Sequence, residues 1–216
     1  MIPVRFAVEY PERCLRLLNQ LEPSARQHEL VGSLSILIAS SAILIPYERM
    51  RSRHPMHHKG RDTDLSKALK SLEKREFFCK AQFWNDSSPG DWRFSRIMTD
   101  PYDTYGWRDE AGKHPLALDA KNTIDERKAG DVLRVVRNAI AHGNIVYLND
   151  NGIEQAGTKV EFLAFLSRYE ENEDSRTFPE TYRVVVTTEE NFLRFVKQWT
   201  TWIATFRDDV GMFRAA

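Results

Sequence analysis

Apolar residues recur with helical spacing from residue 11 to about residue 144. The pattern predicts a first helix from Pro11 and a second, apolar nearly all round, over residues 24–50, with Pro46 kinking or ending it. It predicts a third helix capped by Asp62 or Asp64, a short one at 92–98, and a fourth opened by the capping pair Thr123 and Glu126 and ending near Gly143.

After Gly143 the hydrophobic period changes from helical to alternating, which predicts strands over 145–148, 160–167 and 182–187. The residues Asn149 to Gly152 predict a turn between the first two strands, and the acidic run 170–174 predicts a loop before the third. Thr187 and Glu190 resemble a capping box ahead of a closing amphipathic helix, whose aromatic stripe we interpret as core. The predicted fold is therefore mainly α: an up-and-down helical bundle with a small antiparallel sheet of about three strands.

Length and composition favour a single domain over residues 1–216, since 216 residues with 42% hydrophobic side chains suffice for one core. Lys plus Arg balance Asp plus Glu at 31 each, which excludes a global basic field, so any polyanion must meet a local patch. Two cysteines, Cys14 and Cys79, fit free thiols in a reducing compartment, and the N-terminus shows no export pattern. We expect a cytoplasmic protein and interpret the uncharged stretch 30–47 as a buried helix, with a membrane span as the alternative.

The segment 135–144, VVRNAIAHGN, holds the candidate chemistry. On a helix, Asn138 and His142 are i and i+4 and share one face, while Arg137 lies about 140° from His142 and can lean across the last turns. An arginine fork can clamp a phosphate, and an imidazole can move a proton near neutral pH. Arginine, amide and imidazole together suit metal-free RNA cleavage, with Arg137 stabilising the phosphate, Asn138 positioning the scissile group and His142 as general acid or base.

The bare spacing does not decide the matter, because Arg49 and His54, Arg53 and His58, and Arg137 and His142 all satisfy Arg-x4-His. Only the third pair lies in a predicted helix with an apolar opposite face and an Asn after the Arg. The structural alternative is a plain helix C-terminus, with His142 favoured by the helix dipole, Gly143 as the C′ residue and Arg137 as a surface charge.

Arg137-Asn138-Ala-Ile-Ala-His142, within RNAIAHGNIVY, resembles the Arg-x4–6-His signature of the HEPN superfamily (higher eukaryotes and prokaryotes nucleotide-binding domain). The likeness extends over about residues 11–148 and includes a long second helix ending in Ile-Pro-Tyr-Glu-Arg; residues 149–216 resemble a strand and helix extension of bacterial and plasmid branches. The resemblance implies an all-α bundle, a homodimer through the motif helices, and a metal-independent endoribonuclease of toxin or defence systems with Arg137 and His142 catalytic and Asn138 assisting. Toxins controlled by adenylylation carry Tyr two residues after the His, whereas this chain has Asn144, so that form of control is not implied.

Two further features bear on the site. The densest basic stretch could track an RNA backbone, or be a solvated loop; it holds His54, His57 and His58 and the candidate RNA-binding residues Arg49, Arg51, Arg53, Lys59 and Arg61. We expect no metal and no cofactor, because no Cys or carboxylate is placed to complete a site with these histidines. Glu48 could orient Arg137 or His142, or be a plain charge at a helix end.

Three hypotheses follow. The first is a HEPN-type endoribonuclease that cleaves RNA by 2′-OH attack and leaves a 2′,3′-cyclic phosphate, with RNA, a second copy and an antitoxin protein as expected partners. The second is a non-catalytic HEPN module that binds RNA, nucleotide or a protein partner. The third is a purely structural role, with the motif at a dimer seam and the aromatic C-terminal helix as the contact surface.

Overall fold

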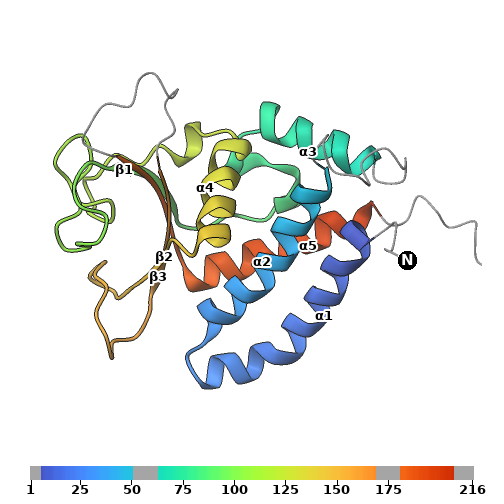
Figure 1. Cartoon of the computed structure of the whole chain (residues 1–216), viewed down its shortest axis with the longest axis horizontal. Coiled ribbons are helices and arrows are strands. Elements are labelled where there is room, and N and C mark those ends of the chain that lie inside the picture. The colour runs from blue at the N-terminus through green and yellow to red at the C-terminus, as the bar shows by residue number, and fades with distance from the viewer. Residues whose placement is uncertain (1–5, 51–62, 169–180, 207–216) are drawn as a thin grey trace, which may run out of the picture.

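The computed structural model describes residues 6–50, 63–168 and 181–206, which form a bundle of helices packed on one face of a small sheet (Figure 1). The helices are α1 (Phe6–Gln27), α2 (Val31–Met50), α3 (Thr63–Arg75), α4 (Ala129–His142) and α5 (Glu189–Thr205). The strands are β1 (Trp92–Ile97), β2 (Ile145–Leu148), β3 (Phe162–Arg168) and β4 (Tyr182–Thr188), in the antiparallel order β1-β4-β3-β2. The predicted mainly-α fold with a small antiparallel sheet is confirmed, with four strands instead of about three.

The predicted short helix at 92–98 is wrong, because this segment is the edge strand β1. Trp92 and Phe94 are buried on the helix side of the sheet, and Ile97 is buried on the other side. All six residues of β1 pair with β4, about 90 positions later in the chain, from Trp92↔Thr187 to Ile97↔Tyr182. This long-range pairing supplies the backbone hydrogen bonds that a local helix would otherwise have made.

The first two helices divide differently from the prediction. α1 begins at Phe6, continues through Pro11 and Pro23, and ends at Gln27, so residues 24–27 belong to it and not to the second helix. The chain turns at Glu29, which has a φ of 56°, and α2 then continues through Pro46 to Met50. Pro46 therefore does not end α2.

Two predicted caps are also displaced. Thr123 and Glu126 belong to a 3₁₀ turn (η4, Ile124–Glu126), and α4 begins after it, at Ala129, without a side-chain cap. The cap of α5 is Thr188, whose hydroxyl accepts a hydrogen bond from the Asn191 amide at 3.2 Å. Thr187, the predicted cap, instead donates its hydroxyl to the Asp91 carbonyl at 2.7 Å. The sequence contains both capping patterns, but the residue at which each helix begins depends on tertiary pairing.

α2 lies at the centre of the bundle and contacts α1, α4 and α5. Its residues Val31–Arg49 are long and apolar enough for a membrane span by length and composition, and half of that window is buried inside the protein. The predicted core role of the α5 stripe is confirmed, since Phe192, Phe195 and Trp199 are fully buried. A second, smaller apolar cluster covers the far face of the sheet, where the segment between β1 and α4 packs Trp107 against it.

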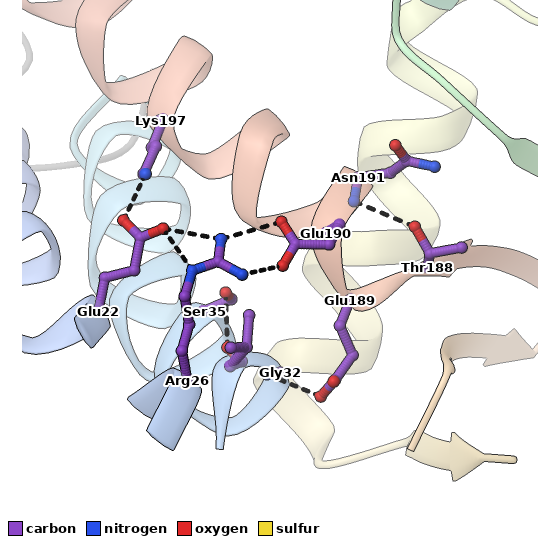
Figure 2. A network of polar contacts seen from close by, with 10 residues as sticks. Glu22, Arg26, Gly32, Ser35, Thr188, Glu189, Glu190, Asn191 and Lys197 are labelled. Carbon is purple, nitrogen blue, oxygen red and sulfur yellow. Dashed lines mark hydrogen bonds and ion pairs between the residues drawn. The ribbon is translucent and has the colours of Figure 1, made fainter. Parts of the chain in front are cut away.

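A polar network ties α1 and α2 to the start of α5 (Figure 2). The Arg26 guanidinium bonds Glu22 of its own helix at 2.8 Å and both carboxylate oxygens of Glu190. Lys197 of α5 also pairs with Glu22, and the Glu189 carboxylate accepts the Gly32 amide of the first turn of α2 at 2.8 Å. The N-terminal turn of α5 therefore contacts both α1 and α2 through its carboxylates.

The network predicts that Arg26 makes a pH-dependent contribution to the free energy of unfolding. The hydrogen bond from Lys197 lowers the pKa of Glu22, and the hydrogen bond from Arg26 lowers the pKa of Glu190, both from 4.5. A carboxyl with a lowered folded-state pKa stabilises the fold above pH 4.5 and loses that contribution as the pH falls through its folded pKa. We expect Arg26→Gln to lower the free energy of unfolding at pH 7 by about 0.2–1 kcal/mol, because the groups are partly exposed.

Urea denaturation at pH 7 and well below pH 4.5 measures this effect, with Arg16→Gln as the control, since Arg16 pairs with Glu12 of its own helix. The difference between Arg26→Gln and wild type should shrink at the lower pH. If the difference in the free energy of unfolding is as large at the lower pH as at pH 7, the pairing of these carboxylates does not contribute to stability.

Candidate functional site

The last two turns of α4 carry the predicted motif, and Gly143 ends the helix as expected. Its φ of 72° is left-handed, and its amide bonds the Ala139 carbonyl. The apolar side of α4 is buried, whereas Arg137 and Asn138 are half-buried and His142 is exposed. The motif residues thus lie at the surface end of a helix that is anchored by its opposite face.

Arg137 is held against α2. Its guanidinium carbon lies 4.9 Å from the ring centroid of Tyr47, an attractive cation–π geometry. Tyr47 is itself buried and stacks on Trp199 of α5 at 5.9 Å, with the two rings 6° from parallel. The Trp199 indole N–H is fixed by the Ala42 carbonyl at 2.9 Å. The position of Arg137 therefore depends on a chain of packed aromatic rings from two other helices.

Tyr47 supports the arginine as a neutral ring. Burial raises the pKa of Tyr47 well above its ordinary value, the Glu73 carboxylate raises it further, and the Arg137 guanidinium opposes the shift. Tyr47 therefore stays protonated at physiological pH. Its contribution to the site is the face of its ring and not a transferable proton.

Asn138 is held from the other side, by the sheet. Its side-chain amide donates to the Ser167 hydroxyl at 3.2 Å, and Ser167 is buried near the end of β3. The same strand fixes the residue after the helix, because the Leu166 amide donates to the Asn144 carbonyl at 2.9 Å. β3 thus orients both the amide of the motif and the chain that leaves it.

His142 is the last residue of α4, and its side chain is exposed. Arg137 leans toward α2 and Asn138 toward β3, and the exposed His142 lies one turn beyond Asn138 at the end of the helix. The same geometry also meets the requirements of a plain helix C-terminus, where a cationic histidine and a left-handed glycine are favoured.

The other predicted site residues stand as follows. Glu48 is exposed at the end of α2, directly after Tyr47, and its role in orienting Arg137 or His142 stays a prediction. Arg49 has only 8% of its surface exposed, which limits direct contact with RNA, so its RNA-binding role also stays a prediction. The remaining residues of the basic stretch lie outside the described residues: Arg51, Arg53, His54, His57, His58, Lys59 and Arg61.

The sequence matches the family described as HEPN pEK499 p136 over residues 2–209. The chain belongs to the HEPN pEK499 p136 family. Membership confirms the resemblance drawn from the motif helix and places this HEPN chain in a plasmid-type branch. No curated protein and no solved structure matches it.

Two residues that support the HEPN motif were missed from the sequence. Tyr47 stands in the Ile-Pro-Tyr-Glu-Arg run that ends α2, but nothing local shows that its ring lies under Arg137. Ser167 had no signal at all, because its contact with Asn138 joins residues 29 positions apart. Both assignments need the packing of α4 between α2 and the sheet.

Other chemistries find little support in the described part of this HEPN chain. Its described residues hold no group of three or more His, Cys, Asp and Glu side chains that could bind a metal. Burial and the neighbouring Asp125 raise the pKa of Cys79 to about 12, and burial raises the pKa of Cys14. Both thiols are thus neutral and are poor nucleophiles at physiological pH.

The contact between Asn138 and Ser167 predicts an energetic coupling between α4 and β3. In a double-mutant cycle of Asn138→Ala and Ser167→Ala, we expect a coupling of about 0.5–1.5 kcal/mol in the free energy of unfolding, since each single change leaves the other group without its partner. The control cycle pairs Asn138→Ala with Ser40→Ala, because the Ser40 hydroxyl donates to the Leu37 carbonyl of its own helix. Additive effects in the first cycle would show that the hydrogen bond does not hold Asn138.

Proposed function

We propose that this HEPN protein is a metal-independent endoribonuclease whose active site is the end of α4. The supporting observation is the convergence there of an arginine fixed by Tyr47, an amide fixed by Ser167, and an exposed imidazole. These are a phosphate clamp, a positioning group and a proton carrier. Fixed side chains at the reacting phosphate lower the barrier because little reorganisation is needed during the reaction.

The proposed reaction is an internal transfer at phosphorus. The imidazole of His142 accepts the proton of the ribose 2′-OH, or donates one to the departing 5′-oxygen. The 2′-oxygen bonds to phosphorus as the bond to the 5′-oxygen breaks, and Arg137 stabilises the charge that gathers on the phosphoryl oxygens. The products are a 2′,3′-cyclic phosphate and a 5′-hydroxyl end.

A homodimer completes this proposal, because one imidazole cannot serve as base and acid in the same step. Two motif helices that face each other supply two imidazoles, one for each proton. The end of α4 suits close approach, since Ala141 and Gly143 are small and exposed. A cytoplasmic location, an antitoxin partner and a toxin or defence role belong to the same proposal.

The alternative function is a HEPN module that binds RNA, nucleotide or protein without turnover. The observation in its favour is that Arg137 and Asn138 are both engaged in ordinary structural contacts, with Tyr47 and Ser167. Recognition of a phosphate needs the same guanidinium and does not need the imidazole to move a proton. The two functions therefore differ in what the loss of His142 does.

The nuclease proposal predicts that purified protein cleaves mixed cellular RNA in EDTA and leaves 2′,3′-cyclic phosphate ends. Loss of a general acid or base costs about 10²–10⁴-fold in rate, and loss of a donor to the developing charge costs about 10²–10³-fold. We therefore expect His142→Ala and Arg137→Ala each to reduce cleavage by at least about 10²-fold. His28→Ala is the matched control, because His28 is exposed at the end of α1. End-group analysis of the products measures the outcome.

Cleavage that survives in the Arg137→Ala, His142→Ala double variant would contradict the proposal. RNA binding by wild type without any product would favour the alternative module.

A further inference from the structure

A groove lies where the turn between α1 and α2 meets the residues before β3 and the start of α5, at the lower side of Figure 1. It consists of two adjoining clefts of about 370 Å³ and about 470 Å³, which share Glu29, Lys159, Val160 and Glu189. Neither Arg137 nor His142 lines either cleft, so the proposed function does not use them. We call the two clefts together the acidic groove.

Most of the charged side chains along the acidic groove are carboxylates. Two cations, Arg26 and Lys159, line it together with five glutamates: Glu29, Glu154, Glu161, Glu189 and Glu190. Figure 2 shows that the Arg26 guanidinium is already held between the carboxylates of Glu22 and Glu190. The side chains that line the groove therefore carry a net negative charge.

Several of these carboxylates have no cationic partner. Within the described ranges, no hydrogen bond or ion pair engages the carboxylates of Glu29, Glu154 or Glu161. Burial raises the pKa of Glu189, the hydrogen bond from the Gly32 amide opposes this shift, and the charges of Glu161 and Glu190 add to it. Cations bound in the groove would relieve the repulsion between these like charges.

Apolar side chains line the same groove. Leu30 has 52% of its surface exposed at the turn between α1 and α2, and Val31 and Val160 line the groove with it. The ring of Tyr147 is fixed there, because its hydroxyl and that of Ser33 lie 3.2 Å apart. A lysine or arginine side chain, with an apolar stem and a charged head, suits a surface of this mixed character.

β2 brings free backbone groups to the groove. It is an edge strand that pairs with β3 on one side. The Asn144 carbonyl accepts the Leu166 amide, and successive residues of a strand direct their backbone groups to opposite sides, so Tyr147 directs its amide and carbonyl away from β3. In the part of the chain that the structure describes, no hydrogen bond meets these two groups of Tyr147.

The opposite edge of the sheet is closed by side chains and by the following segment. The Asn122 side chain accepts the Phe94 amide at 3.1 Å and donates to the Trp92 carbonyl at 2.9 Å. The Thr123 amide donates to the Phe94 carbonyl at 3.3 Å. Since an open edge is where an extended peptide can add a strand, β2 and not β1 offers such a place.

We propose that the acidic groove and the β2 edge bind an extended segment of a partner protein that carries apolar and basic side chains. The main chain of this segment pairs with the free amide and carbonyl of Tyr147. Its apolar side chains lie against Leu30 and Val160, and its cations lie near Glu154 and Glu161. A polyamine could meet the carboxylates but not the backbone groups, so the open edge favours a peptide. The inference goes beyond the proposed function, because binding at the groove requires no step at the motif.

The test measures binding of a short fluorescein-labelled peptide of alternating lysine and valine to the full-length protein by fluorescence anisotropy. We expect this peptide to bind and a peptide with glutamate in place of lysine not to bind. The lysine peptide with N-methylated backbone amides keeps its charges but donates no main-chain hydrogen bonds. It should therefore bind several-fold more weakly.

Variants of the groove test the same contact from the side of the protein. Glu154→Gln with Glu161→Gln should weaken peptide binding by about three- to tenfold at low salt, and by less at high salt. Lys159→Gln removes a cation from the groove and should strengthen binding. The matched control, Asp86→Asn with Glu126→Gln, removes two negative charges from exposed positions that do not line the groove. Thermal unfolding of each variant verifies its fold.

The outcomes separate the possible occupants. If the lysine and glutamate peptides bind equally, or if the groove variants match the control, the acidic groove is not the binding site and the proposal fails. If N-methylation leaves the affinity unchanged, or if spermine displaces the peptide at equal concentration, the groove binds cations without main-chain pairing and the proposed partner segment is wrong.

Discussion

The packing of α4 between α2 and the sheet is the constraint on which the site depends. One side of its last two turns meets Tyr47 through Arg137, and the other meets Ser167 through Asn138. The start of the helix is held as closely, because a Cβ at Gly130 would lie 2.7 Å from the backbone carbonyl of Glu73 in α3. A helix fixed at both ends presents its C-terminal residues in one place, and pre-organised groups of this kind are what catalysis or tight recognition requires.

The formal charges of the chain sum to zero, and many of them pair with opposite charges at particular places in the fold. Near the start of α5, Arg26 and Lys197 are matched by Glu22 and Glu190 in a network that joins helices. On the sheet, Arg96 of β1 pairs with Glu110 of the segment that follows this strand, at 2.7 Å.

The sequence alone predicted what depends on local periodicity. α4, its end at Gly143, the shared edge of Asn138 and His142, and the apolar stripe of α5 follow from spacing along the chain. β1 was missed because its partner is about 90 residues away, and because a short alternating run between Pro and Gly residues gives only a weak strand signal. For α5 the capping pattern named the right residue type at the wrong position, because the pairing of β4 decides where the backbone leaves the sheet, whereas α4 begins without a side-chain cap.

The difference between local spacing and long-range packing also explains which site residues the sequence predicted. Arg137 and His142 were predicted because both stand on one helix, whereas Tyr47 and Ser167 lie on segments that only the fold brings next to that helix.

The central claim is that RNA phosphate lies between Arg137 and His142, and NMR of the histidine side chains in the presence of non-cleavable 2′-deoxy-substituted RNA tests it most directly. The account predicts that the imidazole signals of His142 shift on addition of this RNA, that those of His28 do not, and that Arg137→Ala abolishes the shift. RNA binding that leaves the His142 signals unchanged would contradict the account.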